Sequence, residues 1–446
     1  MNTVVTLPLW LFVLILLFAA VTASTHLLFP SVRWFFRRRA ERVVAELNKR
    51  LERPIQPFKL LRRQDMLRRV LYDPEVTRAV AEHAKSEGVR EDVAFERAER
   101  YAREIVPSFS ASAYFGFAIR AARWLSNLLF DVRVHRVAPD ALAGIDKDAT
   151  VVFVINHRSN MDYVLVTYLA AEQSALSYAV GEWARVWPLS RLIRAMGAYF
   201  IRRKSHTNLY RRVLASYVEK ATEAGVTQAV FPEGGLSRNG LVGPPKLGIL
   251  SYIVSGHDPE GADVVFVPVS LNYDRVIEDR ILVAANRSEK RRFKASTPEA
   301  IRFSLRYLRR RITGQVGRFG VAAVSFGAPI VLDKNADLEN LGDALRDAIE
   351  ANVPVVSAPL ILSAIRRLGD ETDPSRIQAE VRSLLDALPA HVPVDASADD
   401  VERELGVLTV RKLISEKDGR YSVVDDELAE FYINSIAHHF GESVET

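Results

Sequence analysis

The chain has 446 residues, of which 48% are hydrophobic and 26% are charged, and its formal net charge is +5. This length and composition suit one large catalytic domain with a smaller one, and they exclude a disordered or collagen-like chain. The absence of cysteine excludes disulfides, thiolate metal sites and a cysteine nucleophile, so any nucleophile must be oxygen or nitrogen.

An uncharged, largely apolar run extends from Leu7 to Phe29. As a helix it would be about 35 Å long, against about 30 Å of bilayer hydrocarbon. Basic residues follow the run instead of preceding it, which favours an anchor over a signal peptide and would keep the following chain in the cytoplasm. We therefore expect a single-pass transmembrane anchor at residues 1–32, with the catalytic domain on the cytoplasmic side.

Residues 33–128 form a second predicted region, basic at its start and helical further on. The segment 31–70 has 13 basic and 4 acidic residues, which fits either a surface lying against anionic headgroups or a solvated helix. Apolar positions then recur at three- and four-residue spacing in "VTRAVAEHA" and "AYFGFAIRAARWLSNL". This spacing predicts helices.

Strand-like runs alternate with helical stretches from residue 129 to residue 335. The runs are "FDVRVHRV", "TVVFVI", "QAVFPE", "DVVFVPVSL" and "GVAAVSFG". Such alternation predicts an α/β domain. The pattern is helical again over residues 336–446, where "LGVLTVRKLISEKDGRYSV" predicts a β-hairpin at its Lys-Asp-Gly turn, in a winged-helix-like order.

A polar cluster interrupts the apolar run "VVFVINHRSNMDYVLVTYL" at residues 151–169. His157 follows a predicted strand, and Asp162 comes five residues later, where a helix should begin. On one ideal helix this spacing separates two side chains by about 140°, so the pair can meet only in a strand-to-helix turn. There the carboxylate would fix the imidazole tautomer and leave the other ring nitrogen to accept a proton from a hydroxyl. Taken alone, the pair also fits a hydrogen-bonded structural histidine.

Three further polar stretches follow apolar runs: "GAYFIRRKS" at 197–205, "FPEGGLSRNG" at 231–240 and "VFVPVSLNYD" at 265–274. Open α/β sheets bind ligands at strand ends. Gly234 and Gly235 would let the backbone approach a ligand closely, while Ser237 and Arg238 could donate to phosphate oxygens. Each stretch by itself also fits an ordinary turn.

In this order, the four stretches resemble the conserved blocks of the glycerol-3-phosphate acyltransferase family, in the branch shared with dihydroxyacetone-phosphate acyltransferases. "NHRSNMDY" is similar to the first block, "GAYFIRR" to the second, "FPEGGLSRNG" with "PPKLG" to the third, and "VPVSLNYD" to the fourth. The resemblance implies a central mixed sheet flanked by helices and a catalytic pair of His157 and Asp162. It implies substrate-binding roles for Arg158, Ser159, Arg202, Arg203, Glu233, Gly234, Gly235, Ser237, Arg238, Lys246 and Pro268.

The resemblance also implies a reaction. A fatty acyl group would pass directly from an acyl-CoA or acyl carrier protein thioester to glycerol 3-phosphate, giving lysophosphatidic acid among membrane phospholipids, with no cofactor. A lysophosphatidate (sn-2) acyltransferase or a dihydroxyacetone-phosphate acyltransferase would use the same pair. A membrane-tethered regulator that binds nucleic acid is disfavoured by the acidic residues of the C-terminal region. A metal site is not supported either, because the sequence has no pair of histidines at helical i, i+4 spacing with a carboxylate.

Overall fold

The computed structural model divides the chain into two compact units, Met1–Ile55 and Gln56–Thr446, which we treat separately. The described residues are 8–17, 42, 45–46, 48–49, 51, 55–60, 63–169, 176–181, 189–202, 207–287, 317–369 and 371–441.

In the first unit, residues 9–17 are helical, and most of their apolar side chains are exposed, from 49% for Phe12 to 79% for Leu9. Within the described ranges, no helix is both long enough and apolar enough to cross a bilayer. The anchor expected over residues 1–32 falls largely on residues 1–7 and 18–32, which lie outside the described residues. The anchor therefore stays a prediction.

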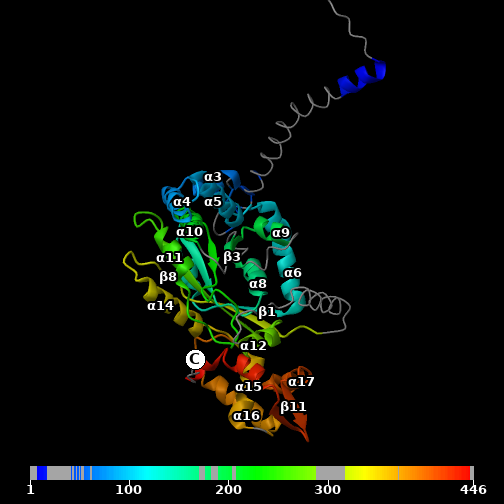
Figure 1. Cartoon of the computed structure of the whole chain (residues 1–446). Helices are drawn as coiled ribbons and strands as arrows, with labels where there is room; N and C mark the ends of the chain where they lie inside the picture. The colour runs from blue at the N-terminus through cyan, green and yellow to red at the C-terminus, as the bar shows by residue number, and fades with distance from the viewer. Residues whose placement is uncertain are drawn as a thin grey trace, which may run out of the picture. The chain divides into compact units, whose positions relative to one another are not determined.

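A mixed eight-stranded sheet forms the centre of the described part of the second unit (Figure 1). Its main path runs in the order β1-β7-β6-β2-β5-β3-β4, with β8 paired to β6. The β6–β7 and β6–β8 pairs are antiparallel, and the others are parallel. The strands are β1 (Asp131–Arg136), β2 (Thr150–Ile155), β3 (Ser177–Gly181), β4 (Tyr199–Ile201), β5 (Gln228–Val230), β6 (Val264–Tyr273), β7 (Val321–Phe326) and β8 (Ile330–Val331). The predicted central mixed sheet is confirmed.

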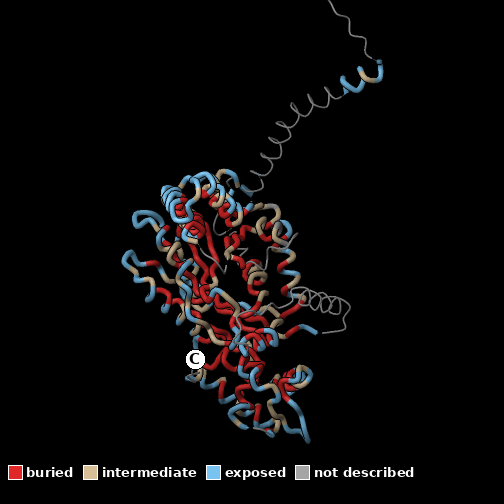
Figure 2. Tube along the Cα trace, in the orientation of Figure 1, coloured by how far each residue is buried: buried red, intermediate tan, exposed pale blue. Residues whose placement is uncertain are grey.

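Helices cover both faces of the sheet, which is why its central strands are continuous apolar runs. Along β2, Val152 and Val154 face one hydrophobic cluster, whereas Val151, Phe153 and Ile155 face the other. Figure 2 accordingly shows the strands buried beneath more exposed helices. The first cluster is covered by α2 (Pro57–Leu60), α3 (Arg63–Leu71), α4 (Pro74–Glu87), α5 (Glu91–Ile105), α10 (Asn208–Glu223), α11 (Leu247–Ser255) and α14 (Leu338–Ala351).

The opposite face carries a second set of helices, which includes the one that begins at Asp162 and most of those of the C-terminal region. They are α6 (Ile119–Leu129), α7 (Pro139–Ala143), α8 (Asp162–Leu169), α9 (Leu189–Ala195), α12 (Asp279–Arg287), α15 (Ser357–Leu368), α16 (Pro374–Asp386), α17 (Val401–Val410) and α18 (Asp426–Ile433). A π-helix, η1 (Ser112–Ala118), runs directly into α6, so the predicted helix over residues 113–128 exists but begins with π geometry.

The C-terminal region also contains short strands and 3-10 helices, and two of the strands form a hairpin. They are β9 (Val355–Val356) paired in parallel with β10 (Val394–Asp395), η4 (Ala398–Asp400), β11 (Ile414–Lys417), β12 (Arg420–Val423) and η5 (Ala437–Phe440). The β11–β12 pair is antiparallel, and Asp418 and Gly419 turn it with φ of 52° and 74°, as expected for a two-residue hairpin loop. The predicted hairpin is confirmed. The boundaries proposed at residues 128 and 335 lie inside the second unit and remain predictions.

Candidate active site

The turn between β2 and α8 carries His157. Asn156, directly before it, donates from its amide nitrogen to the Leu271 carbonyl oxygen at 3.0 Å and accepts from the Leu271 N–H at 2.7 Å. Both groups are buried, so these bonds fix the turn against β6. The helix then begins at Asp162, as the sequence predicted.

Asp162 is fully buried and accepts four hydrogen bonds. Its Oδ2 accepts from His157 Nδ1 at 2.9 Å and from the backbone N–H groups of Arg158 and Ser159 at 2.7 Å and 2.9 Å. Its Oδ1 accepts from the Tyr273 hydroxyl at 2.5 Å. Since an ionised carboxylate only accepts, we assign the proton to Nδ1 of His157, which leaves Nε2 as a proton acceptor. The structure thus brings together the pair predicted from the sequence.

Glu233 supports His157 from the third sequence block. Its Oε1 accepts from the His157 backbone N–H at 2.8 Å, and its Oε2 accepts from the Gly243 N–H at 3.2 Å. Burial raises the pKa of Glu233 to about 7, although both hydrogen bonds and the Arg158 charge act in the opposite direction. Glu233 therefore holds the backbone of the proposed base.

A cavity of about 410 Å³ opens beside His157. The rings of Phe231 and Tyr163 flank the imidazole, with centroid separations of 4.4 Å and 5.2 Å. The other lining residues come mainly from β3, β4, α10, β5 and α11: Ala179, Val180, Gly181, Ile201, Arg202, Tyr210, Arg211, Leu214, Val230, Pro232, Gly234, Lys246, Gly248, Ile249, Leu250 and Tyr252. Cationic side chains thus share a mostly apolar cavity with the proposed base, an arrangement suited to an anionic, partly apolar ligand.

Gly234 lies in the left-handed region, with φ +65°, and a Cβ there would lie 2.9 Å from Cδ of Lys246. Only glycine meets both conditions without strain or displacement of the lysine. The backbone N–H of Lys246 also donates to the Pro232 carbonyl oxygen at 2.8 Å. The third block therefore places Lys246 along the cavity wall.

Arg202 also lines the cavity and forms a bidentate ion pair with Glu104 of α5, at 2.9 Å and 2.7 Å. Its guanidinium lies over the rings of Tyr101 and Tyr210, 5.0 Å and 5.6 Å from their centroids. Arg203, the other arginine of the second block, lies outside the described residues.

Two predicted binding residues next to His157 have other contacts. Arg158 is buried and donates through Nε to the Leu271 carbonyl oxygen at 3.2 Å, and burial lowers its pKa to about 10. The Ser159 hydroxyl donates to Glu278 Oε2 at 2.8 Å. Neither residue lines the cavity. Their described contacts fix the turn, and direct roles in substrate binding stay predictions.

The remaining predicted residues also lie off the cavity wall. The Ser237 hydroxyl donates to the Leu241 carbonyl oxygen at 2.8 Å and accepts from the Gly240 N–H at 3.1 Å, which closes the loop. Arg238 is exposed, Gly235 is half-buried and Pro268 is buried within β6. Their proposed contacts with substrate stay predictions.

Arg211 was missed by the sequence analysis, although it lines the cavity. It lies on α10, outside the four blocks, so only the packing of α10 against the sheet brings it to the site. Tyr273 carried a signal, because it stands at the strand end of the fourth block, but the sequence did not reveal its contact with Asp162.

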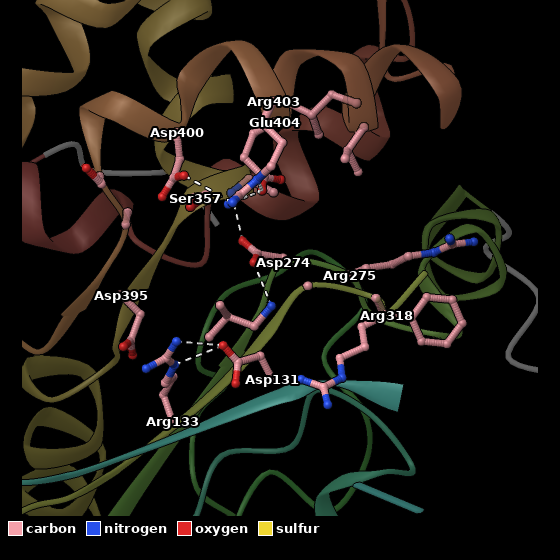
Figure 3. Close-up of a pocket in the computed structure, with 18 of the residues that line it drawn as sticks. Asp131, Arg133, Asp274, Arg275, Arg318, Ser357, Asp395, Asp400, Arg403 and Glu404 are labelled. Atoms are coloured by element: carbon pink, nitrogen blue, oxygen red, sulfur yellow. Dashed lines mark hydrogen bonds and ion pairs between the residues drawn. The ribbon is translucent and has the colours of Figure 1, made fainter. Parts of the chain in front are cut away.

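A second cavity, of about 560 Å³, shares no lining residue with the first and contains none of the predicted site residues (Figure 3). Arg133 pairs there with Asp131 at 2.7 Å, and Arg403 pairs with Glu404 at 3.0 Å. Asp274 accepts from two backbone N–H groups on its wall, and burial raises its pKa to about 6. Each ion pair lies within one element, β1 or α17, whereas Asp274 joins Val321 of β7 to Ala358 of α15.

Known acyltransferases are similar to this chain. Residues 134–272 match the family model described as Acyltransferase. A glycerol-3-phosphate acyltransferase of Shewanella amazonensis is 28% identical over 449 residues, covering 89% of this chain and 53% of the relative. One of Pseudomonas aeruginosa is 27% identical over 423 residues, covering 85% and 49%. One of Ectopseudomonas mendocina is 31% identical over 290 residues, covering 63% and 33%.

The chain thus spans about half, or less, of the length of these curated relatives. The solved structure of the 1-acyl-sn-glycerophosphate (LPA) acyltransferase from Thermotoga maritima matches with a TM-score of 0.34 and 21% identity, covering 53% of this chain and 75% of that chain. The chain carries an acyltransferase domain over residues 134–272, and its similarity to glycerol-3-phosphate acyltransferases confirms the family resemblance of its four sequence blocks.

Proposed function

We propose that this protein transfers a fatty acyl group from an acyl thioester to the sn-1 hydroxyl of glycerol 3-phosphate, giving lysophosphatidic acid. The observation that carries this proposal is the oriented His157–Asp162 pair beside a cavity that also holds Arg202, Arg211 and Lys246. The names of the curated relatives support the choice of acceptor.

In the proposed reaction, Nε2 of His157 takes the proton of the acceptor hydroxyl while that oxygen attacks the thioester carbonyl. The new C–O bond forms, the C–S bond breaks, and the imidazolium returns its proton to the leaving thiolate. Asp162 offsets the charge that develops on the ring. Direct transfer fits the geometry better than an acyl-serine intermediate, because the Ser159 hydroxyl donates to Glu278 instead of His157.

The cavity offers partners to both substrates. A phosphate dianion has little apolar surface, so its affinity must come from charge-assisted hydrogen bonds such as Arg211 and Lys246 could donate. The apolar wall, with Val180, Leu214 and Ile249, suits the alkyl part of an acyl group. We propose acyl-CoA or acyl carrier protein as the donor, and the chemistry requires no cofactor.

An assay of purified protein in detergent, with a panel of acceptors and thioesters, tests the proposal. Lys246→Ala and Arg211→Ala should each raise the KM for glycerol 3-phosphate about tenfold or more, because charge-assisted bonds are worth roughly 1.5 to 3 kcal/mol, while the thioester KM stays nearly constant. Arg238→Ala, at an exposed position off the cavity wall, tests in the same assay the phosphate contact that the sequence predicted for Arg238.

The same assay separates the alternatives. Preferred use of lysophosphatidate or dihydroxyacetone phosphate by the wild type would replace the proposed acceptor. If Arg238→Ala raises the acceptor KM and Lys246→Ala does not, the phosphate binds at the third-block loop and not in the cavity.

We further propose that residues 1–32 anchor the protein by a single pass, with the catalytic domain on the cytoplasmic side and membrane phospholipids around it. Supporting observations are the exposed apolar helix at residues 9–17 and the basic residues that follow the apolar run.

A further inference from the structure

The end of β6 projects past the end of β2. The two strands pair in parallel from Thr150 with Val264 to Ile155 with Val269, and β6 then continues to Tyr273. The projecting residues therefore lie beside the turn that carries His157, where Leu271 already exchanges two hydrogen bonds with Asn156. Tyr273 is thereby held within reach of the catalytic pair.

We infer that Tyr273 is a positioning residue, whose hydroxyl holds the Asp162 carboxylate in the orientation that aligns His157 for proton transfer. The inference rests on the proposed function for its catalytic meaning. Oδ2 of Asp162 accepts from His157 and from two backbone N–H groups, while Oδ1 accepts from the Tyr273 hydroxyl. Both oxygens are thus engaged, so the carboxylate cannot rotate about its Cβ–Cγ bond without losing hydrogen bonds in a site that water does not reach.

Tyr273 itself is rigidly placed. Its side chain is buried, and its ring packs against Phe130 with centroids 5.4 Å apart. Burial and the neighbouring Asp162 charge raise the pKa of Tyr273 well above its usual range. The phenol therefore remains a neutral donor through the pH range in which the enzyme would work.

The Tyr273 hydroxyl donates to Asp162, and Tyr273 is not among the residues that line the cavity, so we take its effect to pass through Asp162. The charged groups near the pair are Arg158, Glu233 and Glu278 on the protein side and Arg202, Arg211 and Lys246 on the cavity wall. A change confined to Tyr273 leaves all of them in place. Removing the phenolic donor leaves the carboxylate charge less dispersed, which favours the protonated imidazole. The acid limb of the pH–rate profile should then move to higher pH.

The chain contains a matched control. Tyr432 is also buried, and its hydroxyl donates to a carboxylate, Asp279 Oδ2, at 2.8 Å. That bond belongs to the attachment of the C-terminal region and does not involve His157. Tyr432→Phe therefore removes the same type of hydrogen bond, together with the bonds that this hydroxyl accepts from Val276 N–H and Arg411.

The test compares the full-length wild type with Tyr273→Phe and Tyr432→Phe, using deuterium exchange at the His157 ring Cε1–H across pH, read by mass spectrometry. We expect Tyr273→Phe to raise the pH midpoint of exchange by about half a unit or more, and Tyr432→Phe to leave it in place. Equal midpoints in wild type and Tyr273→Phe, or equal shifts in the two variants, would overturn the inference. The exchange measurement needs no turnover, so it tests the role of Tyr273 whether or not the wild type is active. An inactive wild type would refute the proposed reaction without deciding the inference about Tyr273.

A comparison of kcat between single and double variants distinguishes an effect through Asp162 from a general loss of structure. If Tyr273 acts through Asp162, the double variant of Tyr273→Phe with Asp162→Asn should have nearly the same kcat as Asp162→Asn alone, whereas independent effects would multiply. Should Tyr273→Phe fail to fold, incorporation of 3-fluorotyrosine at position 273 keeps the shape and strengthens the donor. The midpoint should then move to lower pH, and a shift to higher pH would contradict the inference.

Discussion

His157 and Asp162 are each at most 2% exposed, so their geometry is set by protein contacts and not by water. Replacing His157 with Ala should lower kcat by about 10² to 10⁴, the usual contribution of a positioned base. Asp162→Asn should cause similar damage, because an amide can stabilise the wrong imidazole tautomer. Steady-state kinetics on folded variants checks both, and near-normal turnover in His157→Ala would rule out the proposed mechanism.

Glu233 gives a prediction about pH at the same scale. Burial raises its pKa from the ordinary value of 4.5 to about 7, so its contribution to stability is complete below pH 4.5 and is lost as pH rises through 7. Each pH unit is worth about 1.4 kcal/mol, so the loss can reach about 3 kcal/mol. Glu233→Gln cannot ionise and should escape this loss.

Thermal midpoints of wild type and Glu233→Gln, measured from pH 4.5 to pH 7.5, check this expectation. The wild type should lose stability relative to the variant as pH rises. The raised pKa of Asp274 affects both proteins alike and cancels in the difference. Parallel curves would mean that the Glu233 carboxyl is not held in its buried, neutral form.

The sequence predicted the catalytic pair but not the direction of every polar side chain. His157 and Asp162 could be paired because the strand-to-helix turn limits where five residues can go. The motif that suggested phosphate contacts from Ser237 and Arg238 identifies residue types only, and the Ser237 hydroxyl in fact closes its own loop. The contact between Tyr273 and Asp162 spans 111 residues of sequence and depends on the register of β6 against β2.

At the scale of elements, long apolar runs were predictable, whereas among the short strands β5 was predicted and β3, β4 and β8 were not. β2 and β6 are buried along their whole length, and their β-branched residues identify them. β4 has three residues and β8 has two, too few to show a period. The π geometry of η1 leaves no sign in apolar spacing that separates it from an ordinary helix turn.

Gly240 joins two distant elements and provides a prediction at this scale. Its φ is +87°, and a Cβ would overlap the carbonyl group of Phe431 in α18, beside the bond from Asn434 Nδ2 to the Asn239 carbonyl oxygen. Gly240→Ala should therefore destabilise the attachment of the C-terminal region by about 2 kcal/mol or more.

Thermal unfolding and limited proteolysis around α18 would measure this destabilisation. Gly406→Ala is the control, because its Cβ would meet open space within α17 and alanine favours a helix by up to about 1 kcal/mol. If Gly240→Ala is as stable and protease-resistant as Gly406→Ala, the loop and α18 do not pack as described.

At the scale of the whole molecule, the cavity draws its walls from segments that are far apart in sequence. Arg202 is oriented by Glu104, 98 residues earlier, and Arg211 arrives on a helix that belongs to none of the four blocks. Such a wall follows from the packing of helices on a sheet whose strand order differs from the chain order. Sequence pattern could therefore locate the edge of the sheet that carries His157 and two cationic residues of the cavity wall, Arg202 and Lys246, but not Arg211.

Membrane attachment belongs to the same scale, because it involves two separate features of the chain. The apolar run would insert into the bilayer, and the basic residues of 33–55 would add attraction to anionic headgroups. Deleting residues 1–30 should thus leave a protein that still binds anionic vesicles at low salt, since each basic residue near such a surface is worth about 1 kcal/mol. The Debye length is about 8 Å at physiological ionic strength and shortens as salt is added. This residual electrostatic binding should therefore weaken strongly as the salt concentration rises.

Sedimentation with vesicles of anionic or zwitterionic lipid, over a range of salt concentrations, checks the expectation. A second truncation that lacks residues 1–55 removes the first compact unit together with its basic residues, while the second unit keeps its own hydrophobic clusters. It should lose the charge-dependent binding that the first truncation retains. Two outcomes would show that the basic segment is not the second attachment: binding of the protein without residues 1–30 that ignores salt and lipid charge, or equally strong binding of the protein without residues 1–55. In either case an apolar surface of the second unit would have to hold the protein at the membrane.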